Sequence, residues 1–210
     1  MDKVKVKKIL DILEQTFPDA KPELNFSNEF ELLIAVILSA QCTDIRVNIV
    51  TEQLFKNYNT PQKMLQLSQT ELAEIIKPCG LNNSKAKHIL SACKTLIDNF
   101  NGKVPSNLKE LKSLDGVGQK TANVVYSVAF GGNAIAVDTH VFRVSNRIGL
   151  ADASTPLKVE EQLKKVINKD RWAKSHHLLI FLGRRICFSR KPNCQGCPLA
   201  DLCKKKDVCR

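Results

Sequence analysis

The sequence predicts an all-α protein. Apolar residues recur at helical spacing along most of the 210 residues, and no segment has a convincing alternating pattern of the kind a β-strand requires. Helix-start signals recur as well, because Asn28 with Glu31, and Ser68 with Glu71, have the spacing of a capping box before an apolar run. With 43% hydrophobic residues, the chain is able to bury a substantial core.

The helices can be placed in order along the chain. The first covers residues 5–16, where the apolar side chains share one face. The box at Asn28 precedes ELLIAVILSA, which is apolar on nearly every side and is therefore expected to be buried, and the box at Ser68 precedes ELAEIIK. Further helices are expected at about 44–57, 84–99, 107–113, 119–130, 139–148, 156–168 and 172–186. Pro156 stands at a position favoured in a first helical turn.

The charge of the chain indicates a polyanionic partner. The formal net charge is +11 and the sequence pI is about 9.3, which makes nucleic acid the leading candidate, although composition does not separate DNA from RNA or from an anionic membrane surface. There is no apolar run long enough to cross a membrane, and the N-terminal MDKVKVKKIL is unlike a signal peptide. A cytosolic protein is expected, or a nuclear one in a eukaryote.

Four cysteines near the C-terminus have the spacing of metal ligands. Cys187, Cys194, Cys197 and Cys203 are separated by six, two and five residues. Thiolates select zinc, copper(I) or iron–sulfur clusters, and structural zinc usually takes two closely spaced pairs. Only one such pair is present here, which favours a 4Fe-4S cluster, and the spacing differs from that of electron-carrying ferredoxins. The alternative is four buried or disulfide-bonded cysteines.

The other four cysteines lie outside this loop. Cys42, Cys79 and Cys93 fall in apolar or helical segments and are expected to be inert core residues in a reducing compartment. Cys209 follows Cys203 at the same interval that separates Cys203 from Cys197, which makes it a conceivable substitute ligand.

Two glycine turns each lead into a helix. The chain reads GLNNSKA near residue 80 and GVGQKTA near residue 116. In the second, Gly116 and Gly118 allow a tight turn between two helices and expose successive N–H groups. Such groups at a helix N-terminus bind phosphate and hold a DNA backbone without reading its sequence. The alternative is an ordinary αα-hairpin with a glycine turn.

Several of these motifs occur together in a known family. LDGVGQKTANVV, AVDTHVFRVSNRIG and the four-cysteine loop resemble the endonuclease III family of helix-hairpin-helix DNA glycosylases, which carry a 4Fe-4S cluster. SAQCTD at 39–44 and GLNNSKA at 80–86 match further family segments in the same order, so the resemblance covers nearly the whole chain.

The resemblance implies a fold and an activity. The fold has two helical lobes: residues 21–132 form a central domain with the hairpin, and residues 1–20 and 133–210 form a terminal domain with the cluster, the active site lying between them. The activity is removal of oxidised pyrimidines from duplex DNA, followed by cleavage of the abasic site by β-elimination. A monomer is implied, in the bacterial or archaeal cytoplasm at the nucleoid, or in a eukaryotic nucleus or mitochondrion.

The resemblance also implies two catalytic residues. Lys120 matches the family's lysine nucleophile, which attacks the sugar C1′ and forms a Schiff base. It must be neutral to attack, and a partly desolvated lysine at a helix N-terminus among other positive charges loses its proton more readily. Asp138 matches the essential carboxylate, which stabilises the cationic sugar and assists proton transfer. From the residues alone, Asp138 before Thr139 is expected to be a helix N-cap, and the two roles are compatible.

The same comparison implies a set of DNA-binding residues. Gln41 matches the residue that fills the space left by the flipped nucleotide, and Leu81 matches the wedge on the opposite strand. Without the family, Gln41 would be an ordinary polar residue at a helix end and Leu81 a core leucine. The remaining members of the set are Gly116, Val117 and Gly118 in the hairpin, His140 after the aspartate, and Arg190 and Lys191 in the cysteine loop, which would otherwise be a solvated loop.

Asp115 departs from the family pattern, which usually has proline there. We expect a less rigid hairpin and weaker affinity for the DNA backbone. Three alternatives remain at this point. An adenine glycosylase shares the hairpin, aspartate and cluster but normally lacks the lysine and carries a further C-terminal domain, for which this chain is expected to have no room. The others are a non-catalytic DNA-binding module with a structural zinc and a ferredoxin-like electron carrier.

Overall fold

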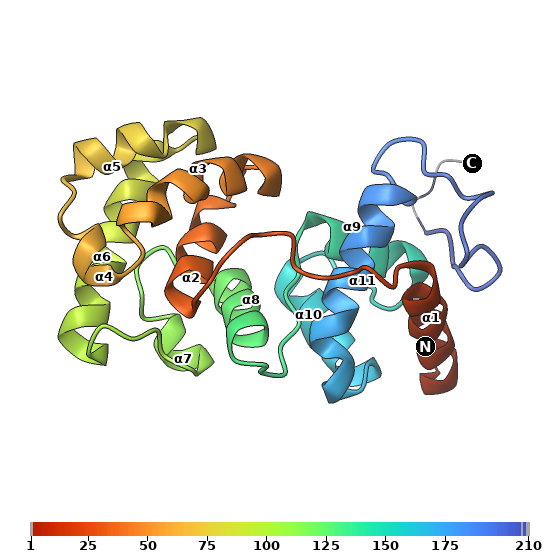
Figure 1. The fold of residues 1–210 in the computed structure, drawn as a ribbon. Coiled ribbons are helices and arrows are strands. Elements are labelled where there is room, and N and C mark those ends of the chain that lie inside the picture. Colours follow the sequence, from red (N-terminus) through yellow and green to blue (C-terminus); the bar gives the residue numbers. More distant parts are fainter. Residues whose placement is uncertain (1, 207, 209–210) are drawn as a thin grey trace. The chain divides into compact units, whose positions relative to one another are not determined.

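Helices are the only regular secondary structure in residues 2–206 and 208, the part of the chain that the computed structural model describes (Figure 1). The predicted all-α class is confirmed over this part. The chain folds into two compact units, one formed by residues 23–132 and the other by residues 1–22 and 133–210. Each unit has its own hydrophobic core.

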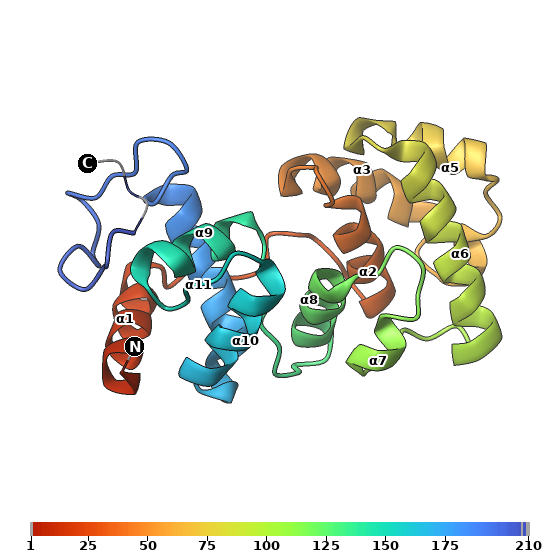
Figure 2. The same cartoon turned by 180° about the vertical axis from the view of Figure 1, so that it is seen from behind.

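The central unit is built around one fully buried helix. Its elements are α2 (Glu29–Leu38), α3 (Asp44–Asn57), α4 (Pro61–Met64), α5 (Gln69–Ile75), η1 (Lys77–Cys79), α6 (Asn82–Phe100), α7 (Leu108–Leu111) and α8 (Gln119–Ala129). Helix α2 packs against α3, α6 and α8, as Figure 2 also shows, and every residue from Phe30 to Leu38 is buried. An apolar helix enclosed on all sides has no polar face to turn toward water, which explains its sequence.

The start of α2 departs from the prediction in one bond. Asn28 caps the helix as expected, because its Oδ1 accepts the N–H of Glu31 at 2.9 Å. The Glu31 carboxylate, however, accepts the N–H of Ser27 at 2.6 Å, one residue before the position that a capping box uses. The second half of the predicted box at Asn28 is therefore wrong. The box formed by Ser68 and Glu71 is confirmed in both of its bonds.

The terminal unit joins the N-terminal helix to the C-terminal half of the chain. Its elements are α1 (Lys3–Thr16), α9 (Thr139–Ile148), α10 (Pro156–Val166), η2 (Lys169–Arg171) and α11 (Trp172–Arg185). Helix α11 packs against both α9 and α1. Arg171 donates to Asp11 at 2.7 Å and to Glu14 at 2.9 Å, so two ion pairs join α1 to the start of α11. The four-cysteine loop follows α11 directly.

No helix in the described residues combines the length and the apolarity that crossing a bilayer requires. The predicted helix positions agree closely with the structure: 44–57 and 139–148 are found with the expected bounds, and the others differ by a few residues at their ends.

Two adjacent histidines in α11 have different surroundings. His176 is buried, and its Nδ1 lies 2.9 Å from the carbonyl oxygen of Ala136. Burial lowers the pKa of His177 to about 3, and the neighbouring His176 and Lys174 add to this effect. His177 is therefore neutral in the folded protein, whereas an unfolded chain protonates it near pH 6.5.

We predict that the free energy of unfolding falls as the pH drops below about 6.5. His177 binds a proton in the unfolded chain at such pH values but stays neutral in the folded protein. The slope from this group is at most ~1.4 kcal/mol per pH unit. Denaturant unfolding of wild type and His177→Asn between pH 7.5 and 5 measures it, and the stability of the variant should fall less steeply. Parallel pH curves for the two proteins would contradict the prediction.

Candidate functional site

The turn between α7 and α8 requires a glycine. Gly116 has φ +76°, a backbone conformation that favours glycine, and a Cβ built there would lie 2.9 Å from the Cβ of His88 on α6. Val117 is 6% exposed and packs into the central core, which anchors the turn. Gly118 is the N-cap of α8, and a Cβ there would have nothing within 4 Å, so the surface before the helix is open.

Asp115 occupies part of this turn. Its Oδ1 accepts the N–H of Gly116 at 3.0 Å and lies 3.9 Å from Nε2 of His88. The carboxylate therefore uses one of the N–H groups that the turn could otherwise offer to a phosphate, and it adds negative charge there. The weaker affinity for the DNA backbone stays a prediction.

Lys120 is the second residue of α8 and is exposed. The partial desolvation expected for its amine stays a prediction. Its position follows from the hairpin, because the turn through Gly116 and Gly118 brings the chain into α8 with Lys120 in the first helical turn.

Asp138 caps the start of α9, as expected. Its Oδ1 accepts the N–H of Val141 at 2.7 Å, and the side chain is half-buried. A carboxylate at a helix N-terminus is favoured by the helix dipole. His140 is the second residue of the same helix, with Nδ1 3.3 Å from the guanidinium of Arg143. Gly183 of α11 makes this packing possible, because a Cβ there would lie 3.0 Å from His140.

Gln41 and Leu81 lie in two exposed turns of the central unit. Both have the left-handed backbone that residues other than glycine rarely adopt, with φ of +55° and +50°. Leu81 is 55% exposed, so the alternative of a core leucine is wrong. Left-handed backbone at such residues costs roughly 1–3 kcal/mol each and is concentrated at functional sites.

A buried lysine joins these two turns, and sequence reasoning missed it. Lys85 is 4% exposed, and its Nζ donates to the carbonyl of Leu38 at 2.8 Å and to that of Cys79 at 2.9 Å. Burial lowers the pKa of Lys85. Leu38 ends the helix before Gln41, and Cys79 lies two residues before Leu81. The only available signal was that Lys85 lies at helical spacing from Ile89, Ala92 and Leu96, on the apolar face of its helix.

The four loop cysteines come together in space. All four are half-buried and line one pocket with Leu182, Ile186 and Leu199. Burial raises the pKa of Cys197 and of Cys203, and the proximity of the other loop cysteines raises both further. Clustered thiols in an apolar setting are donors that a metal centre satisfies, since a bound metal removes the repulsion between thiolates.

Zinc and a 4Fe-4S cluster place their thiolate ligands differently. Among residues 2–206 and 208, no three His, Cys, Asp or Glu side chains are arranged to hold a single metal ion. A zinc ion requires its sulfurs at about 2.3 Å from one point, whereas a 4Fe-4S cube holds its thiolates at separate corners. Four cysteine thiolates are the donor set of a 4Fe-4S cluster. Cys209 lies outside the described residues.

Two arginines of α9 hold the first part of this loop, and the sequence analysis did not identify them. Arg143 donates through Nε and a terminal nitrogen to the carbonyl of Cys187, at 3.2 and 3.0 Å. Arg147 donates to the carbonyls of Phe188 and Ser189, at 2.6 and 2.9 Å, and lies 3.6 Å from the sulfur of Cys187. Their spacing of four residues on one helix was the available signal.

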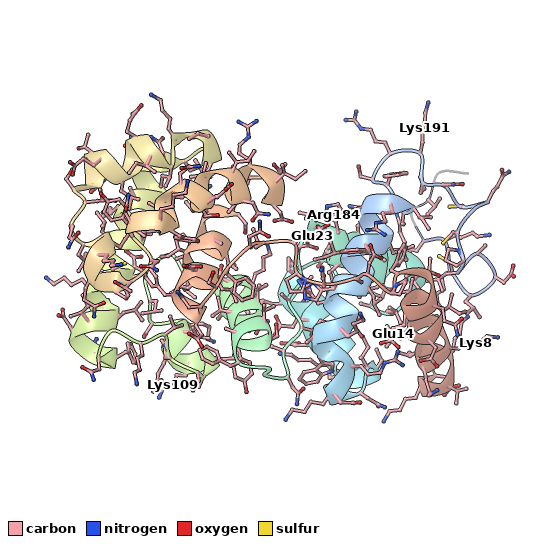
Figure 3. The ribbon with its side chains drawn as sticks, in the orientation of Figure 1. Lys8, Glu14, Glu23, Lys109, Arg184 and Lys191 are labelled. Atoms are coloured by element: carbon pink, nitrogen blue, oxygen red, sulfur yellow. The ribbon has the colours of Figure 1, made fainter. Side chains whose placement is uncertain are left out.

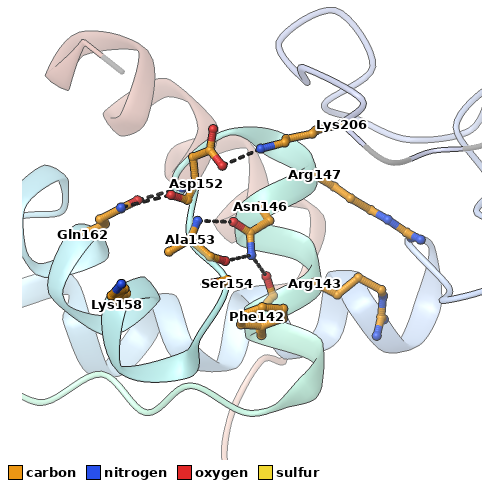
Figure 4. A pocket seen from close by; sticks show the side chains of 10 residues that line it. All are labelled: Phe142, Arg143, Asn146, Arg147, Asp152, Ala153, Ser154, Lys158, Gln162 and Lys206. Carbon is orange, nitrogen blue, oxygen red and sulfur yellow. Dashed lines mark hydrogen bonds and ion pairs between the residues drawn. The ribbon is translucent and has the colours of Figure 1, made fainter.

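Figure 4 shows the large open pocket beside these arginines. It is lined by residues of α9, α10 and the segment between them, with Lys206 at its edge. The guanidinium groups of Arg143 and Arg147 point away from Ser154 and Lys158, toward the carbonyls of the cysteine loop. The pocket contains none of the residues expected to be catalytic.

Arg190 and Lys191 are exposed in the loop between the first two cysteines. Figure 3 shows the side chain of Lys191 extending outward from this loop. Lys191 has φ +49°, so the chain bends sharply there. The positive charges of Arg190 and Lys191 thus face solvent. The start of the loop that carries them is held by hydrogen bonds from Arg143 and Arg147.

Comparison with known proteins gives a consistent result. Residues 34–169 match the HhH-GPD superfamily of base excision DNA repair proteins, and residues 187–203 match the iron-sulfur binding domain of endonuclease III. The chain is 51% identical to endonuclease III of Rickettsia conorii over 198 residues, covering 94% of each chain. It is 47% identical to endonuclease III of Escherichia coli strain K12 over 207 residues, covering 99% of this chain and 98% of that one.

A solved structure agrees over the same length. The structure of a trapped endonuclease III–DNA covalent intermediate superimposes with a TM-score of 0.93 at 49% identity, covering 98% of this chain and 97% of that one. The chain therefore belongs to the endonuclease III family of helix-hairpin-helix base excision repair enzymes, which are DNA glycosylases and abasic-site lyases with a 4Fe-4S cluster.

Proposed function

We propose that this enzyme removes oxidised pyrimidines from duplex DNA and cleaves the abasic site through a Schiff base on Lys120. The observation that carries the proposal is the exposed amine of Lys120 in the first turn of the helix that follows the glycine hairpin. The trapped covalent intermediate of the related endonuclease III supports a covalent step. The proposed substrate class rests on family membership.

In the proposed reaction, the neutral amine of Lys120 attacks C1′ and the bond from C1′ to the base breaks. The amine loses a proton to the departing base, and the C1′–O4′ bond then breaks with protonation of O4′, which opens the sugar ring and gives the iminium. The iminium makes the C2′ proton acidic, and its removal expels the 3′ phosphate by β-elimination. Asp138 supplies the negative charge that stabilises the cationic sugar and takes part in proton transfer. Its bond from the Val141 N–H supports this role, because it fixes the position of the carboxylate at the start of α9.

The DNA-binding roles are likewise proposals. We infer that Gln41 fills the space left by the extruded nucleotide and that Leu81 separates bases on the opposite strand. The exposure and left-handed backbone of both residues support this inference. Phosphate contacts are assigned to the hairpin residues Gly116, Val117 and Gly118, and to His140, Arg190 and Lys191.

The organisation of the protein follows the same reasoning. We propose that the two compact units correspond to the two domains, with Lys120 supplied by the central one and Asp138 by the terminal one. We also propose that the enzyme acts as a monomer and, because the relatives named above are bacterial, at the bacterial nucleoid. Cys187, Cys194, Cys197 and Cys203 hold the cluster, which cross-links the loop that carries Arg190 and Lys191.

A trapping experiment tests the nucleophile. With duplex DNA that contains an oxidised pyrimidine, borohydride should reduce the Schiff base and leave a covalent protein–DNA adduct. Lys120→Ala should abolish this adduct, because it removes the attacking amine, whereas Lys109→Ala, an exposed lysine of the same hairpin, should retain it. An adduct that survives in Lys120→Ala would exclude Lys120 as the nucleophile. An adduct formed only on a pre-made abasic duplex would refute the proposed substrate class.

The effect of the Asp115 charge on DNA affinity can be separated from the effect of the hydrogen bond that Asp115 accepts. Asp115→Asn keeps an oxygen that can accept the Gly116 N–H but removes the charge. We expect the Kd for duplex DNA at low salt to decrease by about two- to fivefold, as removal of one repulsive surface charge predicts. Asp98→Asn removes a charge from an exposed site on α6 and serves as the control. Equal Kd values for the two variants, or an unchanged Kd in Asp115→Pro, would contradict this expectation.

The arginine contacts predict a structural role for Arg147. Arg147→Gln removes two charge-assisted hydrogen bonds to the cysteine loop and should lower the free energy of unfolding by about 2–4 kcal/mol. Iron content and unfolding by denaturant are the measurements, and both should fall relative to Lys158→Gln, which removes an exposed charge from the same pocket. Unchanged iron content and stability would show that the loop does not depend on Arg147.

A further inference from the structure

Lys85 holds the turn that contains Leu81 through both its backbone and its side chain. Its backbone N–H donates to the carbonyl of Leu81 at 2.9 Å, and its Nζ donates to the carbonyl of Cys79 at 2.9 Å. Helix side chains point back toward the N-terminus of their helix, so the Lys85 side chain extends over the segment that precedes α6. One residue therefore fixes both ends of the segment from Cys79 to Leu81.

The same Nζ reaches the segment that leads to Gln41. It donates to the carbonyl of Leu38 at 2.8 Å, across 47 positions of sequence. Leu38 is the last residue of α2, where helix carbonyls have no partner within the helix. Inside the Gln41 turn, the N–H of Cys42 donates to the carbonyl of Ser39 at 3.2 Å, at the long end of the usual range. The contact from Lys85 is the shorter of the two, and it anchors this turn to α6.

The bridge that Lys85 makes lies in the core of the central unit. Leu38 is 0% exposed, Cys79 is 2% exposed and Lys85 is 4% exposed. A buried carbonyl that lacks a donor costs free energy, and an apolar side chain at position 85 would remove this donor from both carbonyls. The long stem of lysine and its several N–H groups allow one side chain to serve two acceptors. The residue type therefore fits a bridge between two segments.

Exposed side chains stand directly beyond both anchored carbonyls. Gln41 follows Leu38 by three residues, and Leu81 follows Cys79 by two. Both exposed residues have left-handed backbone, with φ of +55° and +50°, which the surrounding contacts must maintain. Because one nitrogen binds both carbonyls, the two turns cannot move apart without breaking a hydrogen bond. An arrangement that is formed in advance reduces the ordering that DNA binding must supply.

We propose that Lys85 is a positioning residue for nucleotide extrusion, because it fixes the Gln41 and Leu81 turns relative to each other before DNA binds. The proposal rests on the DNA-binding roles proposed above for Gln41 and Leu81. Lys85 is buried, so it acts through the two turns and does not contact DNA itself. Extrusion of a nucleotide from the duplex then depends on Lys85, whereas the first contact with backbone phosphates does not.

Single-turnover kinetics of the holoenzyme test this role. Lys85→Met keeps the length of the side chain but removes its donors. With active enzyme in saturating excess over a duplex that contains an oxidised pyrimidine, the rate constant of base removal should fall about tenfold, which corresponds to ~1.4 kcal/mol. This rate constant does not depend on the fraction of enzyme that is folded, so a loss of stability alone leaves it unchanged. The Kd for undamaged duplex, which requires no extrusion, should change by less than about twofold.

A matched control is available on the same helix. Lys94→Met removes an exposed lysine of α6, and both its rate constant and its Kd should equal those of the wild type. An unchanged rate constant in Lys85→Met, or an equal loss in Lys94→Met, would overturn the proposal. Lys85→Leu also lacks a donor and takes less space, so it provides the same comparison if Lys85→Met fails to fold.

A double-mutant cycle shows whether Lys85 acts through the two turns. In the Gln41→Ala, Leu81→Ala protein, adding Lys85→Met should lower the rate constant by less than about twofold, because the side chains that it positions are gone. A tenfold loss in both backgrounds would overturn the proposal, since Lys85 would then act elsewhere. A wild-type rate constant in Gln41→Ala, Leu81→Ala itself would refute the roles proposed for those residues, and the positioning role with them. Borohydride trapping on Lys120 tests the proposed reaction separately.

Discussion

A buried cation must find hydrogen-bond acceptors, and in this protein the acceptors are carbonyls beside the turns that are proposed to bind DNA. Lys85 donates to the last residue of α2 and to the end of η1, so it fixes the two segments that lead to Gln41 and Leu81. Arg143 and Arg147 do the same for the start of the cysteine loop. Irregular turns have few internal hydrogen bonds, and these charges supply the missing ones.

Helix starts supply the second constraint. Lys120 and Asp138 both stand at the beginning of a helix, where the backbone N–H groups and the helix dipole act on nearby charge. The consequences differ. The carboxylate of Asp138 gains a hydrogen bond from Val141 and the favourable dipole, whereas the Lys120 amine is exposed beside the open end of the hairpin. Asp115 adds a negative charge to the surface of the hairpin, and its carboxylate accepts the N–H of Gly116.

Much of the fold could be predicted because helical signals are local. The apolar periodicity and the caps at Ser68 and Asp138 are contained within a few residues, so both the helix positions and the all-α class follow from them. The proposed catalytic and cluster residues came from motifs that resemble those of the family, and each such motif is equally local. Prediction was less successful where a side chain could accept a hydrogen bond from either of two adjacent residues. The Glu31 carboxylate accepts the N–H of Ser27 and not that of Asn28, because a difference of one residue depends on the exact path of the chain.

The sequence by itself determined the helices, the family and the four thiol ligands, since each follows from residues that lie close together in the sequence. Only the tertiary structure decided what distant segments do together. Lys85 donates hydrogen bonds to Leu38 and Cys79, which lie 47 and 6 positions from it in the sequence. Arg147 contacts Phe188, 41 positions away. Such contacts are set by the packing of whole helices, and no local pattern records which surfaces will meet.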